Sequence, residues 1–231
     1  MSRVNVGIVL FGLLGMGLAR DEPVAPFVKT VRVHASLPPF EVRIVPGPPS
    51  QSAWNLPAGE QVRPHPIGRV EISRQGEAKP FQTITVTGLG SPYHLTFTRF
   101  DDASFDGYAD LLLGHDGGAK WGGYEIYFYD PASGTFVENA LSREMSEQLQ
   151  GNDLRFRRAS RTIELDHLVF GCQGEAMTET FALQNGHLRK TGQIDLVQTT
   201  EGCYEVTRLL RAGGMKEVGR RRAPERDRAM E

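Results

Sequence analysis

Several motifs that would identify an enzyme or a zinc protein are missing from the 231-residue sequence. It has only two cysteines, Cys172 and Cys203, and neither a Cys-x-x-Cys pair nor a Cys/His zinc cluster is present in the sequence. Neither a Gly-x-Ser-x-Gly nor a His-Glu-x-x-His motif occurs, and the six histidines are scattered singly. These absences argue against a zinc module, a serine hydrolase of the nucleophile-elbow type and a zincin metalloprotease.

Long apolar runs are also scarce. One run extends from Val4 to Leu18, follows Arg3 and ends at small residues up to Ala19, and no second run follows it. It is shorter than the ~20 apolar residues of a membrane-spanning helix. The pattern is typical of a cleavable export signal over residues 1–19, with an uncleaved anchor as the alternative. No cysteine follows the run, which argues against a lipid anchor, and we expect a periplasmic protein without a membrane span.

If the protein is exported, its two cysteines can be expected to form a disulfide. Cys172 and Cys203 lie 31 positions apart, and an oxidising compartment would let them form a disulfide. Such a bridge contributes roughly 3 to 4 kcal/mol in the chain-entropy model. The alternative is two buried free thiols.

Composition divides the rest of the chain into three regions. Residues 20–66 are rich in proline, which favours loops and short edge strands. Residues 67–207 are expected to form a β domain. From Arg208 to residue 231 the sequence has eight Lys/Arg against four Asp/Glu, whereas residues 20–207 have seventeen against twenty-four. This basic tail lacks interleaved aromatics, so we expect it to be disordered and predict no nucleic-acid partner.

The apolar rhythm from Val70 onward has a period of two. Three segments show it clearly, and an Asn185-Gly186 pair predicts a tight hairpin turn between two further strands. The alternating pairs and triplets are Ile84 and Val86, Leu95 and Phe97, and Tyr124, Ile126 and Phe128. Only Leu141 to Leu149 reads as a helix. The sequence therefore predicts a mainly β fold, a single antiparallel β-sheet domain of propeller-like or sandwich type with one short helix. No repeat of 20 to 50 residues supports a full propeller of many blades.

The most informative segment is Asp102-Ala103-Ser104-Phe105-Asp106-Gly107-Tyr108-Ala109-Asp110. Oxygen-bearing side chains stand at positions 1, 3, 5 and 9, with glycine at position 6, as in oxygen-rich calcium loops. Tyr108 at position 7 would offer its backbone carbonyl. Leu113 replaces the glutamate of an EF-hand at position 12, and a strand rather than a helix is predicted next. The alternative is an acidic, glycine-bearing surface turn.

A glycine-rich segment from Gly114 to Tyr124 follows the acidic loop. Five of its eleven residues are glycine, and Lys120, Trp121 and Tyr124 add a charge and broad aromatic surfaces. Such a loop can approach a partner's backbone closely. The alternative is a flexible connection between two strands with one aromatic folded onto the core.

The sequence resembles the calcium-binding periplasmic immunity proteins of Gram-negative bacteria in three consecutive segments. These are the run from Phe100 to Leu111, the glycine loop and the segment Tyr124 to Phe136. The resemblance extends from about Thr83 to Gln198. It implies a non-enzymatic inhibitor of a lysozyme-like, peptidoglycan-cleaving effector delivered by a type IV secretion system. The calcium loop also resembles that of FG-GAP repeats.

The resemblance assigns roles to individual residues. It implies calcium ligands at Asp102, Ser104, Asp106, Tyr108 (carbonyl) and Asp110, with serine in place of the usual asparagine. It implies an inhibitory loop that enters the cleft of the hydrolase, made of Gly117, Gly118, Lys120, Trp121, Gly122, Gly123 and Tyr124. The alternative functions are a calcium-stabilised adhesion module and a polysaccharide hydrolase.

Overall fold

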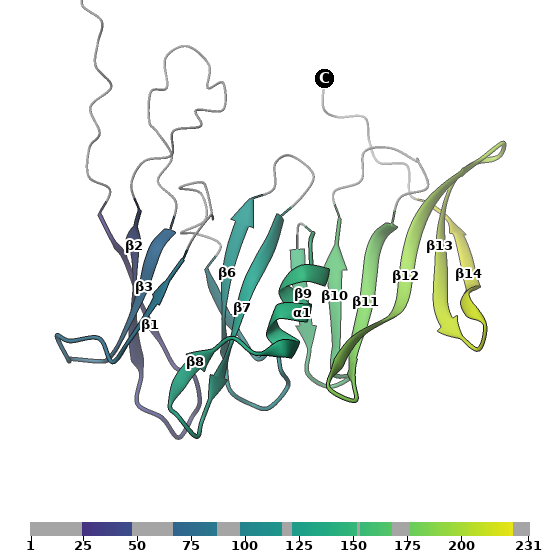
Figure 1. The fold of residues 1–231 in the computed structure, drawn as a ribbon. Helices are drawn as coiled ribbons and strands as arrows, with labels where there is room; N and C mark the ends of the chain where they lie inside the picture. Colours follow the sequence, from purple (N-terminus) through teal and green to yellow (C-terminus); the bar gives the residue numbers. More distant parts are fainter. Residues whose placement is uncertain are drawn as a thin grey trace, which may run out of the picture.

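A computed structural model of the protein describes residues 25–47, 67–86, 98–116, 122–151, 153–167 and 176–223. Within these ranges the fold is mainly β, with antiparallel sheets and one short helix, as the sequence predicted. The three sheets stand beside one another in chain order (Figure 1).

Each sheet is an up-and-down meander in which neighbours in sequence are neighbours in space. The first sheet consists of β1 (Phe27–Val31), β2 (Phe40–Pro46), β3 (Ile67–Arg74) and β4 (Gln82–Thr85). The second consists of β5 (Arg99–Asp101), β6 (Asp110–Asp116), β7 (Gly122–Asp130) and β8 (Thr135–Val137). The third consists of β9 (Asp153–Arg157), β10 (Thr162–Asp166), β11 (Ala176–Gln184), β12 (His187–Thr199), β13 (Gly202–Arg211) and β14 (Gly214–Arg222).

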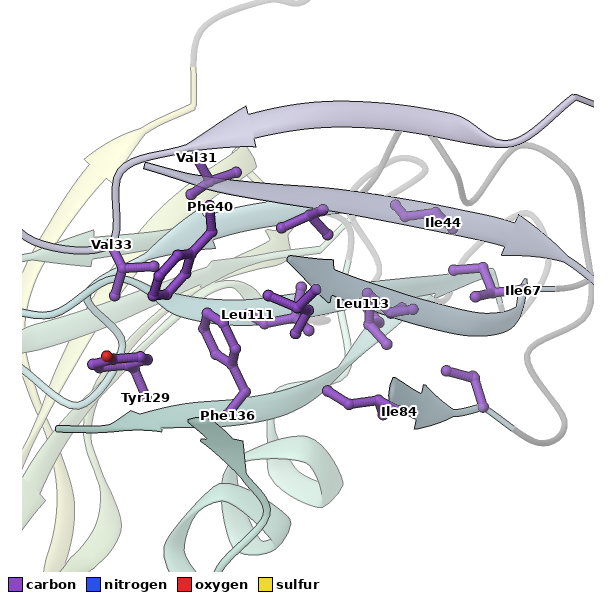
Figure 2. Close-up of a cluster of buried hydrophobic side chains, with 14 residues drawn as sticks. Val31, Val33, Phe40, Ile44, Ile67, Ile84, Leu111, Leu113, Tyr129 and Phe136 are labelled. Atoms are coloured by element: carbon purple, nitrogen blue, oxygen red, sulfur yellow. The ribbon is translucent and has the colours of Figure 1, made fainter. Parts of the chain in front are cut away.

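The middle sheet is buried on both faces, which explains the run of three leucines in β6. Leu111 and Leu113 point into the core shared with the first sheet, whereas Leu112 points into the core shared with the third. Successive side chains of a strand alternate between faces, so only a strand covered on both sides tolerates consecutive apolar residues. Figure 2 shows Leu111 and Leu113 facing Phe40 and Ile44 of β2.

The second core lies between the middle sheet, the third sheet and α1 (Ala140–Gln148). Met145 of α1 and Leu149 just after it are completely buried there. Asn139 caps the helix by accepting the N–H of Ser142, while the Ser142 hydroxyl accepts the N–H of Asn139. The helix predicted for Leu141 to Leu149 is confirmed within one residue at each end.

The β11–β12 hairpin confirms the predicted tight turn. Asn185 and Gly186 both have positive φ, 52° and 77°, and Gln184 pairs with His187 across the turn. These angles are those of the two central residues in a primed hairpin turn. Of the three alternating segments, Ile84 lies in β4 and the Tyr124 to Phe128 segment lies in β7. Leu95 and Phe97 lie outside the described residues.

Two of the predicted region boundaries differ from the structure. In the part of residues 20–66 that the structure describes, Phe27–Val31 and Phe40–Pro46 belong to the first sheet, where β2 pairs with β1 on one side and β3 on the other. Val42 and Ile44 alternate in β2 as core residues, a pattern hidden in the sequence by the surrounding prolines.

The basic segment expected to be disordered from Arg208 forms the end of β13 and all of β14, as far as Arg222. Its backbone pairs with β13 along the whole strand, and Arg221 forms an ion pair with the buried Glu205. Backbone pairing and this charge partner order a strand that has almost no apolar side chains.

Candidate calcium loop and the adjoining hairpin

The acidic segment forms the tight connection between β5 and β6. Phe105 and Gly107 have φ of 59° and 97°, so the chain reverses sharply at these residues. Asp102 Oδ1 accepts the N–H of Gly107 at 3.2 Å, which closes the turn, and Asp106 Oδ1 accepts the N–H of Tyr108 at 2.9 Å. The acidic side chains thus organise the backbone of the turn on which they stand.

Asp110, the first residue of β6, is completely buried. Its Oδ2 accepts the N–H groups of Ala103 and Ser104, each at 2.9 Å, and its Oδ1 accepts the N–H of Tyr129 at 2.9 Å. Burial raises the pKa of Asp110 to about 7, although these three hydrogen bonds favour the carboxylate and oppose the shift. The nearby charge of Asp106 raises the pKa further.

Ser104 provides the observation that bears most directly on a metal. Its hydroxyl oxygen is buried and has no hydrogen-bond partner in the part of the chain that the structure describes. A buried hydroxyl without a partner is unfavourable, and position 3 of a calcium loop is where an oxygen ligand belongs. Three carboxylates, a hydroxyl and a backbone carbonyl form a donor set suited to a hard cation such as calcium.

The loop carboxylates do not converge as they stand. Across the described ranges, no group of three or more His, Cys, Asp and Glu side chains is arranged to hold a metal ion. Asp102 and Asp106 each hold one oxygen against the backbone of the turn. Binding of a divalent ion would therefore require these two carboxylates to rotate toward the Ser104 hydroxyl.

The loop contacts all three sheets. Ala109 donates its N–H to Val33 O at 2.8 Å, beside β1, and the Tyr108 ring stacks on Tyr129 of β7 with centroids 5.4 Å apart. On the third sheet, the Phe105 ring packs edge-on against Phe156 at 6.3 Å. The geometry of this one turn therefore affects how all three sheets are held together.

Arg158 supplies a charge to the same loop. Its Nε lies 3.3 Å from Asp102 Oδ2, and it projects from the turn between β9 and β10. The Asp102 side chain is 5% exposed, so a nearby cation offsets the cost of burying its carboxylate. Sequence reasoning missed Arg158, because a pairing between residues 56 positions apart leaves no local signal.

The two ends of the glycine-rich segment, residues 114–116 and 122–124, are strand. Gly122 and Gly123 open β7 and pair with Asp116 and His115 of β6, so β6 and β7 form a hairpin. The predicted loop residues Gly117, Gly118, Lys120 and Trp121 belong to residues 117–121, outside the described residues.

Tyr124 is a core residue in this hairpin. Its side chain is 7% exposed and lies in the second core with Ile126 and Phe128, because the alternation of β7 directs all three to one face. Its hydroxyl lies close enough to the guanidinium of Arg99 on β5 to affect the pKa of Arg99. Burial by itself would lower the pKa of Arg99, but the hydrogen bond and charge of Asp101, followed by Tyr124, raise it overall. In this position Tyr124 anchors the hairpin rather than presenting its hydroxyl to a partner.

Two further predictions concern the ends of the chain and the cysteines. The export signal over residues 1–19 and Cys172 lie outside the described residues. Among the described residues there is no free cysteine, and the Cys172–Cys203 pairing stays a prediction. No helix in the described ranges is long and apolar enough to cross a membrane.

Fold and loop together define an antiparallel β protein with an acidic turn of calcium-loop pattern at the junction of its sheets. Searches of protein-family models and of curated proteins return no match. Among solved structures, the chain is similar in fold to a Xanthomonas type IV secretion system related protein. The TM-score is 0.51 at 16% sequence identity, and the similarity covers 85% of this chain and 100% of that one. At this identity the similarity shows the fold alone.

Proposed function

We propose that this protein is an exported, calcium-binding immunity protein that inhibits a peptidoglycan-cleaving, lysozyme-like hydrolase. The Ser104 hydroxyl, buried at the third position of the acidic turn and without a hydrogen-bond partner among the described residues, is the observation that carries the calcium assignment. The secretion context is supported by the fold that the chain shares with a type IV secretion system related protein.

In this proposal Asp102, Ser104, Asp106, the Tyr108 carbonyl and Asp110 hold the calcium ion, which supplies a fixed positive charge. The turn and the β6–β7 hairpin are linked through Asp110, which begins β6 and accepts the N–H of Tyr129 on β7. A fixed turn therefore restrains both strands at the base of the hairpin. A recognition loop restrained before encounter loses less conformational entropy on binding.

Recognition of the hydrolase is assigned to the hairpin tip, residues 117–121. Lys120 would pair with catalytic carboxylates of the target, and Trp121 would occupy a sugar subsite. Gly117 and Gly118 would let the backbone enter a narrow cleft. Gly122, Gly123 and the buried Tyr124 would hold the tip in place from β7.

The test is inhibition of cell-wall lysis. Purified mature protein, assayed against a panel of secreted lytic enzymes in calcium, is expected to block at least one of them, and chelator is expected to weaken the block. Lys120→Ala and Trp121→Ala should each abolish inhibition while leaving the melting temperature unchanged. The matched control is Lys79→Ala, which removes an exposed lysine between β3 and β4.

Two other outcomes would replace the proposal. Binding to purified glycan chains without inhibition of any enzyme would favour the adhesion module. Release of soluble fragments from peptidoglycan by the protein itself would favour the hydrolase.

The export assignment includes the Cys172–Cys203 disulfide. A thiol-reactive label should fail to modify the denatured, unreduced protein purified from the periplasm, and it should modify both cysteines after reduction. Labelling before reduction would show that the two thiols are free.

A further inference from the structure

Asp102 and Arg158 form an ion pair whose two side chains differ strongly in solvent exposure. The Asp102 side chain is 5% exposed, whereas the Arg158 side chain is 66% exposed. The carboxylate has lost most of its water, but the guanidinium has kept most of its own. Breaking the pair would thus cost Arg158 little and Asp102 much, unless another cation took the place of the arginine.

A calcium ion bound in the turn would be that other cation. Asp102 stands at the first ligand position, and its Oδ1 is hydrogen-bonded to Gly107, while its Oδ2 faces Arg158 at 3.3 Å. A dication held by the same carboxylate would repel a guanidinium at this distance. Because Arg158 projects from an exposed turn, it can move into solvent without disturbing either core.

We propose that Arg158 is an internal counter-ion that competes with calcium for Asp102 and thereby sets the calcium affinity of the turn. Without calcium, Arg158 neutralises the buried carboxylate and keeps the turn folded. With calcium, it is released from Asp102. This inference rests on the calcium binding proposed above and concerns how tightly the ion is held.

Arg161 provides a matched control. It lies in the same turn between β9 and β10 and carries the same charge, but its guanidinium stands over the Phe105 ring, 6.0 Å from the centroid. Arg161→Gln removes a charge from the same turn without removing the partner of Asp102. Any difference between Arg158→Gln and Arg161→Gln therefore reports on the contact with Asp102.

The experiment combines calorimetric titration of the mature protein with CaCl₂ and thermal melting in calcium and in chelator. At low salt, Arg158→Gln should bind calcium roughly threefold to tenfold more tightly than the wild type, and Arg161→Gln should change the affinity less. The gain should shrink in high salt, where screening weakens exposed charge interactions.

Melting separates competition from a structural role. In chelator, Arg158→Gln should melt below the wild type, because Asp102 loses its counter-ion, and saturating calcium should close this gap. A purely structural arginine would lower the melting temperature equally in both conditions. Unchanged or weaker calcium binding by Arg158→Gln, with normal binding by the wild type, would refute the competition alone. Absence of calcium binding by the wild type would refute the calcium site itself.

Discussion

The backbone N–H of Tyr129 donates to Asp110 Oδ1 at 2.9 Å, which ties β7 to the first residue of β6 at the base of their hairpin. The other oxygen of the same carboxylate holds the N–H groups of Ala103 and Ser104. One buried side chain thus organises the acidic turn and joins it to the strands that carry the proposed recognition tip.

Replacement of Asp110 is expected to destabilise the protein even without calcium. Asp110→Ala leaves three N–H groups without their acceptor, and a buried unsatisfied group costs about 1–3 kcal/mol, so we expect a loss of at least about 3 kcal/mol. Asp110→Asn retains one acceptor oxygen and should lose less. Urea unfolding in chelator measures the loss of unfolding free energy in both variants. Asp106→Ala serves as the control, and we expect it to have a small effect because Asp106 is exposed.

Asp110 also predicts a pH dependence. Its pKa is raised from 3.8 to about 7 on folding, so the folded protein binds this proton more tightly than the unfolded chain does. The stability from this group is complete below the unfolded pKa and is lost as the pH rises toward 7 and above. In chelator the melting temperature of the wild type should therefore fall between pH 5 and pH 8, and most of this fall should be absent in Asp110→Asn, whose side chain does not ionise.

Calcium should reverse this trend, because a bound dication favours the carboxylate. The stabilisation produced by calcium is expected to grow as the pH rises over the same range. A melting temperature in chelator that is equally pH-dependent in wild type and Asp110→Asn would contradict the assignment to this residue.

Substitution of Gly107, in the acidic turn, and of Gly76, in a turn outside it, separates two effects. Both substitutions strain the backbone, but only the first lies in the proposed calcium site. Both have positive φ, 97° and 87°, and an added Cβ would have open space at either position. Each Gly→Ala substitution should therefore cost about 1 kcal/mol from backbone strain alone. Only Gly107→Ala is expected to weaken calcium binding, as measured by calorimetry. Equal calcium affinity in the two variants would argue against a ligand role for the turn.

Tyr124 should behave as a core residue. Tyr124→Ala removes a buried aromatic ring and should cost about 3–5 kcal/mol, so a loss of inhibition in this variant would not identify a contact with the target. Tyr124→Phe keeps the ring and removes only the hydroxyl near Arg99, and we expect it to remain folded and inhibitory. A folded Tyr124→Phe protein without inhibitory activity would instead place the hydroxyl in the interface.

Local features of the chain were predicted well because their cause is local. The Asn185-Gly186 turn follows from the positive φ that these residues tolerate, and the helix at Leu141 follows from its apolar spacing and its cap at Asn139. The reversal at Gly107 in the acidic turn is of the same kind. The basic strand β14 was missed because its order comes from pairing with β13, not from its own apolar pattern.

The sequence by itself determined that this is a mainly β protein with an oxygen-rich turn of calcium-loop spacing, since alternation and turn chemistry act over a few neighbouring residues. Only the tertiary structure decided that Asp102 faces Arg158, that the Ser104 hydroxyl is buried with no hydrogen-bond partner in the described ranges, and that Tyr124 lies inside the core. These facts depend on which sheet covers which face, and burial and charge pairing between distant segments arise only when the sheets come together.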